Sequence, residues 1–136
     1  MTLSAALYTL ATLGVFLLSA KYGLSKAPLA YHKEIIEQDG TVTPGTQRVI
    51  DVLYRVWAGS MAALGICLLG LIWGPAASGA AWAHGVIVLA VAAVAIPSIV
   101  VPRRVEVVTQ VKTPWRLAVA LAGLVVLGCV AWIAGL

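Results

Sequence analysis

The sequence predicts an all-α integral membrane protein, an antiparallel bundle of four transmembrane helices with a short cytoplasmic amphipathic segment after the first helix. Of the 136 residues, 62% are hydrophobic and only 10% are charged, whereas soluble domains are about 45–50% apolar and about 25% charged. All charged residues lie between positions 21 and 55 or between 103 and 116, so four long apolar stretches remain. We therefore expect one transmembrane domain, residues 1–136, whose core is helix packing within lipid.

The first expected span covers residues 2–22. It lacks a basic n-region and a good cleavage site, so we expect a retained helix rather than a cleaved signal peptide. In the polar segment that follows, Leu29, His32, Ile35 and Ile36 share one helical face. This pattern predicts a short amphipathic helix lying on the membrane surface, with an irregular loop as the alternative.

The second expected span, residues 47–73, continues a helix that begins in water. Thr43 suits an N-cap and Pro44 suits the first helical position. The whole helix is roughly 45 Å long, against a hydrocarbon core of about 30 Å, so its first turns project beyond the membrane. A tight uncharged turn over residues 76–81 follows, and we expect spans two and three to be antiparallel neighbours.

The third and fourth expected spans cover residues 80–101 and 115–136. Pro97 removes a backbone donor near the end of the third span and is expected to bend it. We expect Pro102 to close this helix. The β-branched, partly alternating residues 106–112 favour an extended conformation before the fourth span begins.

The basic residues predict the orientation. Lys21 to Arg55 carries five of them and Arg103 to Arg116 carries four, while both termini and the second loop carry none. The positive-inside rule then places loops 23–46 and 102–114 in the cytoplasm and both termini outside, in what we expect to be a bacterial inner membrane. The aromatic residues form matching belts, with Tyr22, Tyr54, Trp57 and Trp115 on the inner side and Tyr8, Trp73, Trp82 and Trp132 on the outer side.

Three candidate functional residues lie on the helix that enters the second span. Arg48, Asp51 and Arg55 fall at i, i+3 and i+7, and Asp51 can pair with either arginine. This Arg–Asp stripe suits the inner mouth of an ion path or a docking point for a partner. The alternative, which we favour, is a salt-bridged helix foot with Arg55 reaching toward the headgroups.

The two histidines are the remaining candidate sites. His84 lies inside an apolar span, where ionisable residues are functional hypotheses, but the adjacent Trp82 indicates a shallow position near the outer interface. His32 lies on the inner side, so the two cannot bind one haem, and isoleucines occupy the positions of spaced metal ligands. Cys67 and Cys129 form no CxxC pair and are expected to be packing residues. We expect no catalytic residue, metal or cofactor.

The leading hypothesis for function is a non-catalytic packing or accessory protein that associates with itself or with a larger membrane complex, in contact with the lipid bilayer. No charge lies near the middle of any span, where proton- or cation-coupled transport usually needs one. The alternative is a small oligomeric transporter or channel with its inner mouth at the Arg–Asp stripe.

Two further classes are disfavoured. A membrane enzyme acting on lipid would use His32, Glu34 and Glu37, but their angular spread around a helix argues against a shared site. The net charge of +4 does not indicate nucleic-acid binding, because the basic residues flank apolar spans, where they set orientation and meet lipid headgroups.

Overall fold

The structure is a computed structural model that describes residues 2–136. These residues form α1 (Leu3–Leu24), α2 (Ala30–Asp39), α3 (Pro44–Leu71), the π-helical turn η1 (Ile72–Ala76), α4 (Ala81–Thr109) and α5 (Trp115–Ile133). Four helices are long and apolar enough to cross a membrane, with α3 and η1 forming one of them. The predicted all-α membrane bundle of four spanning helices is therefore confirmed, and α2 is the expected short helix after the first span.

Local capping explains where the spanning helices begin. The Thr2 side chain accepts the Ala5 N–H at 3.2 Å at the start of α1. Thr43 accepts the Thr46 N–H at 3.1 Å at the start of α3, where Pro44 takes the first helical position as expected. The N-cap of α2, Leu29, makes no side-chain capping bond, so α2 depends more on its tertiary contacts.

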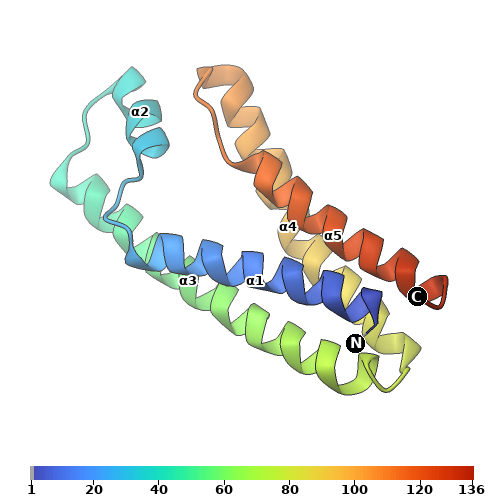
Figure 1. Ribbon diagram of the computed structural model, residues 1–136. Coiled ribbons are helices and arrows are strands. Elements are labelled where there is room, and N and C mark those ends of the chain that lie inside the picture. The colour runs from blue at the N-terminus through green and yellow to red at the C-terminus, as the bar shows by residue number, and fades with distance from the viewer. Residues whose placement is uncertain (1) are drawn as a thin grey trace.

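The helices are arranged with α1 between α3 and α5, while α4 packs on α5 and on η1 (Figure 1). The buried core lies toward the end that holds η1 and both chain termini, which we call the closed end. Its largest fully buried side chains are Tyr8, Thr12, Ile72 and Ile87. The opposite end holds α2 and the α4–α5 loop, and we call it the open end.

Two glycines allow close contacts with aromatic rings of α1. A Cβ atom at Gly65 of α3 would lie 2.7 Å from the Phe16 ring of α1. A Cβ atom at Gly128 of α5 would lie 2.7 Å from the Tyr8 ring, also on α1. Since glycine lets neighbouring helices approach closely in lipid, α1 is packed tightly on both sides.

The relation between α3 and α4 differs from the sequence expectation. The turn was expected to make spans two and three neighbours, but α3 and α4 meet only near η1 and then diverge toward the open end (Figure 1). Pro75 lies inside the wide π-helical turn, and Gly79 completes the reversal with a φ of +84°. Because α3 packs on α1 and α4 packs on α5, neither helix covers the other.

The end of α4 also differs from the expectation. Pro102 does not close the helix, and residues 105–109 are helical rather than extended. Pro102 has no N–H to donate to the Ser98 carbonyl, yet its own carbonyl accepts a hydrogen bond from the Thr113 hydroxyl at 3.0 Å. This contact holds Thr113, in the segment that leads to α5, beside Pro102 of α4.

A single carboxylate organises the return from α4 to α5. Glu106 accepts the Thr113 N–H at 2.8 Å, the Trp115 indole N–H at 3.1 Å and the Arg116 guanidinium at 2.9 Å. Gln110 ends α4 in the left-handed conformation, with a φ of +60°. Hydrogen bonds from polar side chains therefore hold the chain between α4 and α5. The sequence pattern alone did not reveal them.

Candidate functional site

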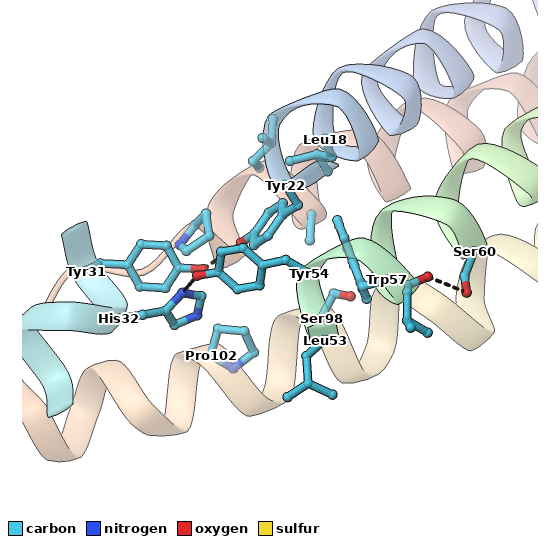
Figure 2. A pocket seen from close by; sticks show the side chains of 14 residues that line it. Leu18, Tyr22, Tyr31, His32, Leu53, Tyr54, Trp57, Ser60, Ser98 and Pro102 are labelled. Carbon is cyan, nitrogen blue, oxygen red and sulfur yellow. Dashed lines mark hydrogen bonds between the residues drawn. The ribbon is translucent and has the colours of Figure 1, made fainter. Parts of the chain in front are cut away.

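The divergence of α3 and α4 leaves a cleft of about 540 Å³ at the open end. Each of the five α-helices, together with the residue before α5, contributes to its walls (Figure 2). We call it the aromatic cleft, lined by Leu18, Tyr22, Tyr31, His32, Leu53, Tyr54, Val56, Trp57, Ser60, Ser98, Pro102, Pro114, Leu117 and Ala118. None of these residues is acidic, lysine or arginine, so the lining is neutral apart from the titratable imidazole.

Tilted and edge-on rings form one wall of the aromatic cleft. The Tyr22 ring centroid lies 4.6 Å from that of Trp57 and 5.0 Å from that of Tyr54, the latter in an edge-on arrangement. On α2, the rings of Tyr31 and His32 lie 3.9 Å apart. Aromatic pairs at these separations pack favourably, so the wall is an aromatic surface with hydroxyl groups at one end.

These hydroxyl groups form a polar cluster where α1, α2 and α3 meet. The Tyr22 and Tyr31 hydroxyl oxygens are 2.5 Å apart, and the Tyr54 hydroxyl is hydrogen-bonded to His32 Nδ1. Figure 2 shows these side chains gathered at the α2 end of the cleft. The Leu29 N–H also donates to the Tyr54 hydroxyl at 3.2 Å. The cluster thus both docks α2 and supplies polar groups to the cleft.

Burial determines the protonation of this cluster. Removal from solvent lowers the pKa of His32, because desolvation disfavours the imidazolium. It also raises the pKa of the Tyr31 hydroxyl, and the hydrogen bond to Tyr22 adds to this effect. At neutral pH the α2 side of the aromatic cleft is therefore uncharged.

The opposite wall comes from the proline-containing end of α4. Pro102 lines the cleft together with Ser98, whose carbonyl lacks the usual helical donor because of that proline. Across the mouth, Gln38 of α2 donates to the Thr109 carbonyl of α4 at 2.9 Å. This bond links the two sides of the open end beyond the apolar part of the cleft.

The Arg–Asp stripe lies outside the aromatic cleft. Arg55 and Asp51 pair at 3.3 Å, with both side chains about half exposed. Together with Arg48 and Lys26 they line a separate surface groove. Arg48 forms no ion pair with any residue in the described part of the chain, and surface pairs of this kind contribute about 0–1 kcal/mol.

His84 lies at the closed end, where it is only 3% exposed. Its Nδ1 is 3.2 Å from the Tyr8 hydroxyl, and its ring stacks on Trp132 at 4.2 Å. Its Nε2 has no hydrogen-bond partner among residues 2–136. The two histidines thus occupy opposite ends of the bundle, and each contacts a tyrosine.

Residues 2–136 contain no cluster of three or more His, Cys, Asp or Glu side chains that could hold a metal ion. Cys67 is exposed on α3, and Cys129 lies partly buried on α5. Both cysteines are free thiols, and α1 lies between their helices.

Sequence reasoning identified His32 but not the aromatic cleft around it. Tyr22, Tyr54 and Trp57 were interpreted only as an interfacial belt, and Tyr31 was not singled out. The available signal was that three of the four tyrosines lie between the end of the first span and the start of the second, on either side of that histidine. Comparisons with protein-family models, curated proteins and solved structures find no match to this chain.

Proposed function

We propose that the protein binds a lipid-soluble amphiphile of the bilayer in the aromatic cleft, as a non-catalytic binding protein. The observation that carries this proposal is the gap between α3 and α4 at the open end. In a membrane bundle, a gap between two spanning helices faces lipid chains. A ligand dissolved in the bilayer would reach the cleft sideways, without crossing water.

The chemistry of the cleft supports an amphiphile. Its volume lies within the roughly 300–1,000 Å³ of ordinary ligand sites, which are also mainly apolar with a few convergent polar groups. Leu53, Trp57 and Leu117 would contact an apolar body, and the tyrosines with His32 would contact a polar head. Tyr and Trp prefer the membrane–water interface, which places such a head at headgroup level.

The charge distribution supports an inner-leaflet location. All nine Lys and Arg residues belong to the open end, and the closed end has none. By the positive-inside rule the open end faces the cytoplasm and both termini lie outside. The ligand would then enter from the cytoplasmic leaflet of the membrane.

Photolabelling in native membranes tests this proposal. A long-chain alcohol with a diazirine in its alkyl chain would be activated by light, and labelled peptides would be mapped by mass spectrometry. We expect labelling concentrated on cleft residues such as Leu53 and Leu117. Exposed residues away from the cleft, such as Leu89 and Ile133, should receive only background label.

A matched pair of variants provides the control. Ala118→Trp places an indole in the cleft, whereas Val119→Trp places one on the neighbouring, lipid-exposed position of α5. We expect the first substitution to abolish cleft labelling and the second to preserve it. Equal labelling of all lipid-facing residues, unaffected by Ala118→Trp, would refute the proposal.

The accessory function expected from the sequence has separate support. The outward face of α3 exposes Gly59, Ala63, Cys67 and Gly70, and a Cβ atom at either glycine would meet nothing within 4 Å. A strip of small residues permits close packing against another membrane helix. A transporter built on the Arg–Asp stripe would instead need its path to form between copies, because the stripe is on the surface.

The thiol of Cys67 tests self-association through this face. If two copies pack through α3, mild oxidation of native membranes should give a disulfide-linked dimer. The dimer should disappear in Cys67→Ser and persist in Cys129→Ser. A chain that remains monomeric after oxidation would argue against this interface.

A further inference from the structure

The hydrogen bonds of Tyr54 determine the donor pattern at the α2 end of the aromatic cleft. Its hydroxyl oxygen accepts the Leu29 N–H at 3.2 Å. A tyrosine hydroxyl also has one proton to donate, and His32 Nδ1 is the one acceptor that it contacts among the described residues. The assignment that uses the Tyr54 proton makes Tyr54 the donor to Nδ1, and in that assignment the nitrogen carries no proton.

The tautomer of His32 follows from this assignment. A neutral imidazole has one protonated nitrogen, so acceptance at Nδ1 places the proton on Nε2. Nε2 forms no hydrogen bond within residues 2–136, and it is not one of their enclosed, unpartnered polar atoms. His32 thus presents a free N–H donor at the wall of the aromatic cleft.

The Tyr22–Tyr31 pair supplies a second donor. The two hydroxyl oxygens lie 2.5 Å apart, so one O–H is used between them. The other O–H has no acceptor in the described part of the chain and remains available. The same end of the cleft therefore presents two unused donors, while the Nδ1 acceptor is already occupied.

Building on the proposed amphiphile binding, we propose that the bound head group is neutral and carries carbonyl oxygens that accept these two hydrogen bonds. The cleft lining has no lysine, arginine or acidic side chain, so it offers no ion-pairing partner to a charged head. The apolar body of the ligand then lies along Trp57 and Leu117. Alkylated quinones and fatty-acyl esters share this chemistry, and both dissolve in the bilayer.

Competition against the photolabel distinguishes the head groups. Decyl-benzoquinone, decyl benzoate and decylbenzene share an apolar chain and a ring, but only the first two carry carbonyl oxygens. For the wild-type protein we expect at least one carbonyl compound to displace the label at about tenfold lower concentration than decylbenzene, as roughly one to two net hydrogen bonds allow. Preference for the quinone or for the ester identifies the source of the head group.

Substitutions at His32 test the named donor. His32→Phe removes the N–H and keeps the ring, so the carbonyl advantage should fall to within about threefold. His32→Gln keeps an amide donor and should retain most of the advantage. Comparing each compound with decylbenzene in the same variant cancels differences in its partition into the membrane.

The possible outcomes distinguish the carbonyl head group from amphiphile binding in general. Equal displacement by all three compounds would overturn the carbonyl head group while leaving amphiphile binding intact. An undiminished carbonyl advantage in His32→Phe would overturn the role of His32. Failure of all three to displace the label from a folded protein would contradict both the binding proposal and the inference.

Discussion

Each end of the bundle contains a hydrogen-bonded Tyr–His pair, and their surroundings differ. At the closed end, Tyr8 and His84 are 1% and 3% exposed, and Trp132 stacks on the imidazole. At the open end, Tyr54 and His32 line a cleft of about 540 Å³. The same two residue types thus form a packed core contact at the closed end and part of the wall of a candidate binding site at the open end.

Helix separation causes this difference. Around Tyr8, Gly128 lets α5 approach α1 closely, and η1 brings the start of α4 onto the same core. At the open end α3 and α4 have diverged, so no spanning helix fills the cleft beside the Tyr54–His32 pair. In this protein the open-end pair therefore belongs to the candidate site, whereas the closed-end pair is a packing contact.

The largest expected effect is on packing at the closed end. Gly128→Ala would place a Cβ atom 2.7 Å from the buried Tyr8 ring, and such overpacking typically costs about 1–3 kcal/mol. Gly123→Ala, on the same helix with nothing within 4 Å, is the control and should be neutral or stabilising. Thermal unfolding in detergent measures both, and equal behaviour of the two variants would refute the tight α1–α5 contact.

A smaller effect is expected from deleting each tyrosine hydroxyl. Tyr8→Phe leaves His84 Nδ1 without its partner in an enclosed site, at a cost of about 1 kcal/mol, which is typical of polar contacts within membranes. Tyr54→Phe should cost less global stability, because water can enter the cleft and hydrate His32. The same unfolding assay compares them, and a larger loss for Tyr54→Phe would reverse the proposed contrast between the ends.

The smallest effect is a pH dependence confined to the open end. Because burial lowers the pKa of His32, undocked α2 binds a proton more readily than docked α2. Docking is then unaffected above the ordinary histidine pKa of about 6.5 and weakens as pH falls below it. The protection factors of the α2 amides, which correct for the slower intrinsic exchange in acid, should fall at mildly acid pH, and His32→Gln should remove that dependence.

Much of the fold could be predicted from the sequence because its signals are local. Hydropathy located the four spans, and Thr43 with Pro44 marked the start of α3. The path beyond Pro102 could not be predicted, since it depends on hydrogen bonds that Thr113 of the returning chain donates to Glu106 and Pro102 of α4. The pattern of β-branched residues alone favoured an extended segment there.

The candidate site was less predictable because it depends on where helices separate. A short turn between spans suggested neighbours, yet packing of α1 against both α3 and α5 leaves α4 apart from α3. The aromatic residues of the cleft also occupy positions that suit an interfacial belt. His32 was identified from its chemistry, whereas its contact with Tyr54, 22 positions away, required the fold.

The central claim is that the open end holds a single amphiphile from the membrane. Native mass spectrometry of protein released directly from membrane vesicles measures this without an added probe. We predict one discrete added mass on the wild-type chain, retained in Val119→Trp and lost in Ala118→Trp. A wild-type chain that carries no discrete added mass, or the same added mass in all three proteins, would contradict the claim.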